Sequence, residues 1–306
     1  MSESKEQFKG IVPTPDSEET SSAPPQPQNI AAPQVPGEVN LQRIDTRRIT
    51  GPLVVFFGPR EIGKTVTLLR LCTYIRSNYR ISPDESFRTD DRYAGTTAAF
   101  ETLLGDMQLA PESTGDINFL LLNITHDGGR FCQFLESPGE HFFDRLKPKA
   151  PYPNYMNRIL AEDYKKIFVL FFELNMFRSD EDLRNYSDKI AGLVSDQIVS
   201  KRDEVIILCN KADLHPHFRG GMPIKAEYRK AIYDHSSFRS LKEALKNSGF
   251  RYVPFVPFSA GAFNNDGTGR KVFALSPEHY PKHLWKEIHE SIQGPSVWSS
   301  LWNIFR

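Results

Sequence analysis

The chain has 306 residues, and 38 Lys plus Arg balance 38 Asp plus Glu, so its formal net charge is zero. This balance excludes the broad basic surface of an ordinary nucleic-acid-binding protein, and 39% hydrophobic residues exclude a wholly disordered chain. The longest apolar run, 167–172, is too short for a transmembrane segment. Cys72, Cys132 and Cys209 stand far apart in apolar stretches, which indicates buried, reduced thiols in a cytoplasmic protein.

Residues 1–48 differ in composition from the rest of the chain. They hold seven of the 22 prolines together with many Ser, Thr, Gln and Glu residues, and Phe8 is their single aromatic residue. Such a segment buries too little apolar surface to offset its chain entropy, so we predict a disordered arm. The spaced prolines also fit a ligand for an SH3-type domain.

Between residues 49 and 293, short apolar runs alternate with helical patterns. The strands are predicted at 53–57, 117–125, 131–135, 167–172, 205–209 and 252–258, and the helices at 64–76, 180–199, 237–247 and 281–292. Nearly continuous apolar runs are typical of parallel strands that are buried on both faces. The alternation therefore predicts one three-layer α/β domain with a mostly parallel central sheet.

A phosphate-binding loop follows the first predicted strand. Residues 58–65 read GPREIGKT and match the pattern G-x-x-x-x-G-K-S/T without exception. The glycines allow backbone N–H groups to curl around a phosphate in front of a helix N-terminus. We expect Lys64 to bridge the β- and γ-phosphates and the Thr65 hydroxyl to ligate Mg²⁺. The expected nucleotide contacts in the loop are Gly58, Glu61, Gly63, Lys64, Thr65 and Val66.

Two later motifs indicate which base is bound. Asn210-Lys211-Ala212-Asp213 follows the run 205–209, and Ser259-Ala260-Gly261 follows the next run, both at ends of strands where α/β sheets bind ligands. With these motifs the chain resembles the Ras-like and translation-factor-like P-loop GTPases of the TRAFAC type over residues 50–293. The resemblance implies a Ras-like G domain that binds GTP or GDP with Mg²⁺.

The resemblance also implies individual roles in base recognition. Asp213 would accept hydrogen bonds from guanine N1–H and N2–H₂, a donor pair that adenine lacks. Asn210 would brace the loop, the Lys211 stem would cover the base, and the Ala260 N–H beside Ser259 would meet guanine O6. These motifs disfavour an ATPase or a P-loop kinase.

The segment that would sense the γ-phosphate departs from the family pattern D-x-x-G. Here the sequence reads Glu136-Ser137-Pro138-Gly139-Glu140-His141. Glu136 would hold Mg²⁺ through water on a longer side chain, Gly139 would contact the γ-phosphate, and Glu140 stands where the family has a water-orienting Gln. His141 lies one residue further than a catalytic His would, and Pro138-Gly139 alone could form a simple turn.

The phosphate loop departs from the family as well. Arg60 and Glu61 replace small residues, and Arg60 could either stabilise transition-state charge or crowd the attacking water. The second Mg²⁺ threonine is expected at Thr96, or else Thr97, in a long polar loop over 77–116. Arg92, in the same loop, is an alternative internal arginine finger or a solvated surface residue.

These features together predict a Mg²⁺-dependent GTPase that acts as a molecular switch. Lys64, Arg60, Gly139 and Glu140 are its expected catalytic groups. The alternative is a GTP-binding interaction module with little or no turnover. The second switch loop is expected to continue to residue 157, and the length of both loops suggests a protein effector or regulator. Similar enlarged loops occur in bacterial GTPase modules of the double-GTPase type.

Residues 294–306 form a separate feature. Trp298, Leu301, Trp302 and Phe305 follow helical spacing and predict an amphipathic aromatic tail. The tail could dock on its own domain, on a partner protein or, as a peripheral contact, on a membrane surface. By contrast, the 215–217 sequence HPH lacks accompanying Cys or carboxylate residues and is read as a polar loop.

Overall fold

The structure is a computed structural model that describes residues 43–106, 119–173, 180–198, 201–214, 234–265, 267 and 271–294. All of them belong to one compact unit, Val39–Arg306. Most of the arm, the aromatic tail from residue 295 and the 215–217 sequence lie outside the described residues. Residues 43–48 are described, and they contain the buried Ile44 followed by the 3-10 turn η2 (Thr46–Arg48).

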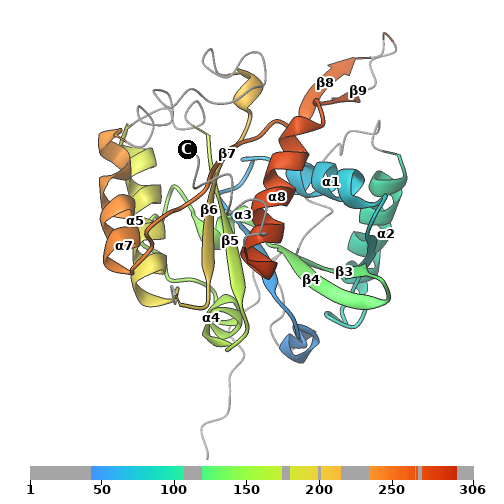
Figure 1. The fold of residues 1–306 in the computed structure, drawn as a ribbon, viewed down its shortest axis with the longest axis horizontal. Helices are drawn as coiled ribbons and strands as arrows, with labels where there is room; N and C mark the ends of the chain where they lie inside the picture. The colour runs from blue at the N-terminus through green and yellow to red at the C-terminus, as the bar shows by residue number, and fades with distance from the viewer. Residues whose placement is uncertain are drawn as a thin grey trace, which may run out of the picture. The chain divides into compact units, whose positions relative to one another are not determined.

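The core is a seven-stranded sheet in the order β2-β3-β4-β1-β5-β6-β7 (Figure 1). Strand β1 pairs in parallel with β4 and β5, and the parallel ladder continues through β6 to β7, whereas β2–β3 and β3–β4 are antiparallel. A separate two-stranded ribbon joins β8 to β9. The strands are β1 (Leu53–Phe57), β2 (Arg80–Pro83), β3 (Leu120–His126), β4 (Gly129–Glu136), β5 (Lys166–Phe172), β6 (Glu204–Cys209), β7 (Phe255–Pro257), β8 (Gly261–Asn265) and β9 (Lys271–Leu275).

Helices cover both faces of this sheet. Helices α5 and α7 pack together on one side, and α1 packs against α8 on the other, so the predicted mostly parallel α/β fold is confirmed (Figure 1). Every side chain of β1 and β5 is buried, as their continuous apolar runs predict. The helices are α1 (Lys64–Ile75), α2 (Asp91–Gly105), α3 (Gly139–Phe142), α4 (Asn154–Ala161), α5 (Asp180–Asp196), α7 (Arg239–Asn247) and α8 (His279–Gln293).

Two elements occupy the stretch that the sequence predicts to be a long polar loop. Strand β2 extends the sheet by pairing with β3, and α2 packs against α1 and β3. The buried face of α2 consists of Tyr93, Thr96, Thr97 and Phe100. Two of these four residues are threonines, so the stripe is too polar to stand out in the sequence. The described part of this stretch is therefore folded, and the prediction of a loop there is wrong.

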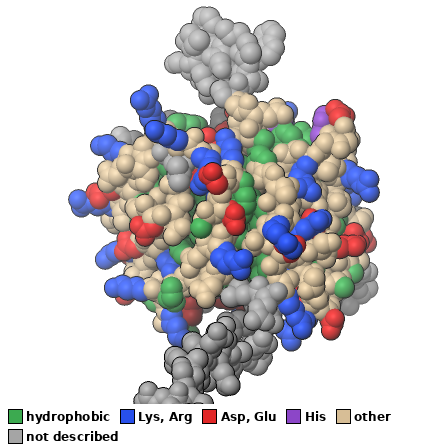
Figure 2. All heavy atoms as spheres, turned by 90° about the horizontal axis from the view of Figure 1, so that it is seen from below, with side chains coloured by type: hydrophobic (Ala, Val, Ile, Leu, Met, Phe, Trp, Pro, Cys, Tyr) green, Lys and Arg blue, Asp and Glu red, His purple; other side chains and the backbone are tan. Residues whose placement is uncertain are grey.

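The surface and the cysteines agree with the composition. Figure 2 shows basic and acidic side chains interspersed over one face of the domain, as expected for zero net charge. All three cysteines are buried free thiols, and burial raises the pKa of the Cys209 thiol to about 12. Within the described ranges, no helix is both long enough and apolar enough to span a membrane.

Candidate nucleotide-binding site

The predicted motifs meet at the carboxyl ends of the parallel strands. The backbone N–H of Asn210, just after β6, donates to the carbonyl of Phe172 at the end of β5, over 2.8 Å. Phe258, just after β7, donates to the Cys209 carbonyl over 2.8 Å, and Ala212 returns a bond to Phe258 over 2.9 Å. Ligands of open α/β sheets bind at this edge. The two predicted base-reading motifs therefore lie beside each other.

The phosphate loop has the backbone shape of an anion cradle. Glu61 and Gly63 adopt left-handed conformations with φ of 65° and 89°, and Gly63 directly precedes α1 without a side-chain cap. For Glu61, which has a Cβ, such a conformation costs about 1–3 kcal/mol. A Cβ at Gly58 would lie 2.7 Å from Phe171 Cβ, so the strand below the loop requires a glycine there. The loop presents the N-terminus of α1, the positive end of its dipole.

Three side chains meet beneath this loop. Thr65 Oγ1 donates to Glu136 Oε1 over 3.1 Å, and Lys64 Nζ donates to the Pro59 carbonyl over 3.2 Å. Burial raises the pKa of Glu136 and lowers the pKa of Lys64, and the attraction between the two charges opposes both shifts. The second carboxylate oxygen, Glu136 Oε2, is buried and has no hydrogen-bond partner of ordinary geometry in the part of the chain that is described.

This set of oxygens fits Mg²⁺. The Thr65 hydroxyl lies beside the Glu136 carboxylate, and Glu136 Oε2 has lone pairs that no hydrogen bond of ordinary geometry uses among the described residues. No group of three or more His, Cys, Asp or Glu side chains gathers among the described residues. The protein would thus supply few ligands, as is usual for Mg²⁺ ions that are held mainly by phosphate oxygens and water.

The Asn210–Asp213 turn is tied to the phosphate loop. Asn210 Nδ2 donates to the Ile62 carbonyl over 2.6 Å. A Cβ on Gly63 would lie 2.6 Å from that nitrogen, so the glycine leaves room for the bond. Asp213 lies in the 3-10 turn η3 (Ala212–Leu214) and is partly exposed.

Lys211 connects the same turn to a neighbouring strand end. Its Nζ lies 2.7 Å from Glu173 Oε2 and donates to the Glu61 carbonyl over 3.5 Å. Lys211 itself has a left-handed backbone, with φ of 55°. Glu173 is buried directly after β5 and was not identified from the sequence. The sequence feature that could have identified Glu173 is its place as the first polar residue after the apolar run of β5, the place that Asn210 has after β6.

The second predicted base-reading loop, residues 259–261, leads into the β8–β9 ribbon. Ser259 is buried, and Ala260 accepts a hydrogen bond from the Ser276 N–H over 3.2 Å. Gly261 has φ of 133°, and any Cβ there would overlap the Ala274 carbonyl oxygen on β9. The ribbon thus fixes the backbone next to Ala260.

The segment after Glu136 approaches the phosphate loop closely. A Cβ on Gly139 would lie within 2.5 Å of three backbone atoms of Pro59 and Arg60. Gly139 starts the short helix α3, so it is more than a simple turn residue. Glu140 is exposed, and the Arg60 and Glu61 side chains are also largely exposed, with 3.8 Å between Arg60 Nε and Glu61 Oε1.

A tyrosine holds the residues that flank Gly139. The Tyr155 hydroxyl on α4 hydrogen-bonds His141 Nδ1 and lies 3.2 Å from Ser137 Oγ. Burial raises the pKa of Tyr155, so the hydroxyl stays protonated. Tyr155 was not identified from the sequence, because the prolines before it favoured a continued loop. Pro153 is instead the N-cap of α4, so the predicted continuation of the loop to residue 157 is wrong from Asn154 on.

The threonine candidates for the second Mg²⁺ contact lie in α2, not in a loop. Thr96 is buried, and Thr97 Oγ1 donates to the Ala94 carbonyl over 3.0 Å within the helix. Arg92 is exposed on the same helix. The loop placement of all three residues is therefore corrected, and their roles toward a nucleotide stay predictions.

Comparisons with known proteins give structural similarity alone. No family model matches the chain, and no curated protein matches it. A structure of the chloroplast translocon components atToc33 and psToc159 is 12% identical, covers 82% of this chain and 86% of its own, and has a TM-score of 0.44. Toc33 from Arabidopsis thaliana in complex with Mg²⁺ and GMPPNP is 13% identical, covers 80% and 86%, and has a TM-score of 0.41. At such identities and TM-scores, the function of this chain must be inferred from its own residues.

Proposed function

We propose that the chain is a cytoplasmic guanine-nucleotide-binding protein that hydrolyses GTP to GDP and phosphate with Mg²⁺, acting as a molecular switch. The observation that carries this proposal is the 2.6 Å hydrogen bond from Asn210 Nδ2 to the Ile62 carbonyl. It joins a turn of the N-K-x-D type to a loop of the G-x-x-x-x-G-K-T type. Such a junction suits a ligand that carries both a base and phosphates.

Each part of the site has a task in this proposal. Lys64 and the amides of the phosphate loop would bind the β- and γ-phosphates and stabilise charge that develops between them. Thr65 and Glu136 would hold the metal ion, which when bound neutralises phosphate charge. Asp213 would select guanine through N1–H and N2–H₂, because adenine would leave the carboxylate unpaired.

Binding without turnover is the second candidate. Glu140 is exposed directly after Gly139 and would bring a negative charge to the side of the γ-phosphate. Arg60, whose backbone lies against Gly139 and whose Nε is 3.8 Å from Glu61 Oε1, would stand near the same phosphate. Repulsion by Glu140 or crowding by Arg60 would slow the attack of water. In that case occupancy by GTP or GDP, rather than hydrolysis, would signal to an effector or regulator.

Single-turnover hydrolysis of γ-³²P-labelled GTP separates these candidates. The wild type should release phosphate above buffer, and Lys64→Ala should abolish release, because it removes the phosphate-binding ammonium. Glu140→Ala and Arg60→Ala then report whether each side chain helps or hinders the attack. If the wild type binds GTP without releasing phosphate, the hydrolytic function is wrong and the second candidate stands.

A further inference from the structure

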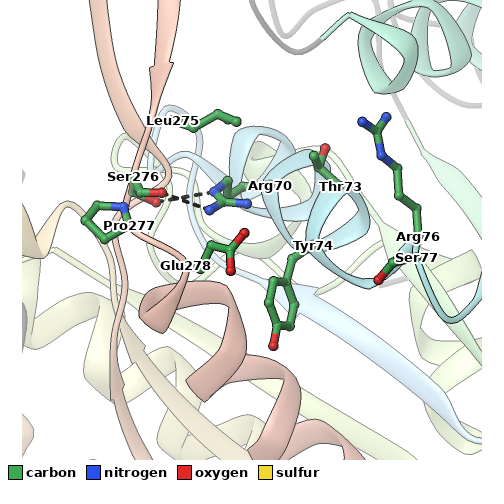
Figure 3. A pocket seen from close by; sticks show the side chains of 9 residues that line it. All are labelled: Arg70, Thr73, Tyr74, Arg76, Ser77, Leu275, Ser276, Pro277 and Glu278. Atoms are coloured by element: carbon green, nitrogen blue, oxygen red, sulfur yellow. Dashed lines mark hydrogen bonds between the residues drawn. The ribbon is translucent and has the colours of Figure 1, made fainter.

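A buried arginine on α1 contacts the segment that follows the β8–β9 ribbon. The Arg70 residue is 4% exposed, and its guanidinium points at Ser276 (Figure 3). Arg70 Nη2 donates to the Ser276 carbonyl over 2.8 Å, and Nε donates to Ser276 Oγ over 3.4 Å. Helix α1 starts at Lys64, so Arg70 lies less than two turns from the predicted phosphate contacts.

Ser276 links Arg70 to the predicted base-reading loop. Its backbone N–H donates to the Ala260 carbonyl over 3.2 Å. Next to it, Leu275 pairs with Gly261 in the ribbon. Ala260 is thus held from one side by Gly261, whose backbone lies against β9, and from the other by Ser276. Two hydrogen bonds in series connect Arg70 to Ala260.

The surroundings of Arg70 show that it is held at a cost. Burial lowers the pKa of Arg70, while the more distant Glu278 carboxylate opposes this shift. Among the described residues, the direct hydrogen-bond partners of its guanidinium are the two neutral oxygens of Ser276, and it forms no ion pair with a carboxylate. A groove of about 940 Å³ opens beside it, lined also by Tyr74 and Arg76. A buried charge with neutral partners is expensive, and a hydrophobic side chain would pack there more cheaply.

We propose that Arg70 is a positioning residue for guanine selectivity. By holding Ser276, it fixes the Ala260 backbone where the N–H can meet guanine O6. The inference rests on the proposed function and adds a residue that lies outside the base-reading motifs. Adenine carries an amino group at position 6, so a displaced Ala260 weakens guanine binding without weakening adenine binding equally.

Equilibrium binding of GDP, ADP and inorganic tripolyphosphate with Mg²⁺ tests this role. Arg70→Met should lower the preference for GDP over ADP by about five- to tenfold, the loss expected for one hydrogen bond. Tripolyphosphate affinity should change less than twofold, because the phosphate loop is untouched. Arg70→Lys keeps one donor and should fall between wild type and Arg70→Met.

Arg76→Met serves as the matched control. It removes the arginine that caps the C-terminal end of the same helix and whose Nη1 donates to the Leu104 carbonyl, away from Ser276 (Figure 3). This variant should retain the wild-type preference within about twofold, well below the loss of a full hydrogen bond.

The outcomes distinguish this inference from the proposed function. If the wild type prefers GDP and a folded Arg70→Met variant keeps that preference, the inference alone is wrong. If Arg70→Met loses tripolyphosphate as strongly as GDP, Arg70 supports the whole site and the positioning role is also wrong. If Arg70→Met does not fold, Arg70→Lys is judged by the same criteria. Equal binding of GDP and ADP by the wild type would overturn the proposed function as well.

Discussion

The close approach of Gly139 to the phosphate loop makes a quantitative prediction for Gly139→Ala. The added methyl would lie within 2.5 Å of three backbone atoms of Pro59 and Arg60. Ordinary contacts between heavy atoms need about 3.5 Å, so one backbone segment must retreat by about 1 Å. No side-chain rotation can relieve an overlap with backbone atoms. Overpacking of this kind costs about 1–3 kcal/mol, which is the expected loss in the free energy of unfolding.

Urea denaturation and thermal melting of the nucleotide-free protein measure this loss. For a domain of this size, each kcal/mol corresponds to about 2–4 °C in Tm. Gly95→Ala is the matched control, because Gly95 lies inside α2 with no atom within 4 Å of an added Cβ. It should raise stability by about 0.5–1 kcal/mol. If Gly139→Ala is as stable as the control, Gly139 does not pack against the phosphate loop.

Three further substitutions test other contacts. Asn210→Ala leaves the buried Ile62 carbonyl without its donor and should weaken GDP binding by about 1–3 kcal/mol, measured by fluorescent-nucleotide titration; unchanged affinity would show that the turn does not brace the loop. Burial raises the pKa of Glu136 above 4.5, so the wild type loses stability as pH rises through the folded-state pKa. Glu136→Gln should therefore gain stability relative to wild type over that range in urea titrations of the nucleotide-free protein, and a constant difference would refute the shift. Glu173→Gln removes a half-buried ion pair with Lys211 and should weaken GDP binding by about 1–2 kcal/mol in the same titration; unchanged affinity would show that this pair does not support the base site.

The sheet could be predicted closely because its strands are buried on both faces. Strand β1 covers the predicted residues Leu53–Phe57, and β5 and β6 each begin one residue earlier than predicted. Because both faces of these strands are covered by helices, almost every residue is apolar, and the strands stand out in the sequence as continuous apolar runs. Strand β7 (Phe255–Pro257) is shorter than the predicted 252–258, where Tyr252 is exposed. The apolar side chain of Tyr252 lies on the protein surface, outside the paired strand.

The phosphate and base motifs could be found in the sequence because each depends on short spacings along the chain. Glu173, Arg70 and Tyr155 could not, because their partners lie 38, 206 and 14 to 18 residues away. The ribbon of β8 and β9 was missed for a different reason. Its polar residues Asn264 and Asn265 lack the apolar alternation that marks a half-buried strand. The sequence therefore does not predict contacts between distant residues, nor strands that lack an apolar alternation.

Competition between GTP and ATP for the same site, with Mg²⁺ present, tests the central claim most directly. A carboxylate that reads N1–H and N2–H₂ should favour GTP by at least about 100-fold. Asp213→Asn should remove most of that preference. It should also improve the binding of XTP, because xanthine carries a carbonyl acceptor at C2 where guanine carries an amino donor. If ATP competes as well as GTP and Asp213→Asn changes nothing, the chain is not a guanine-nucleotide-binding protein.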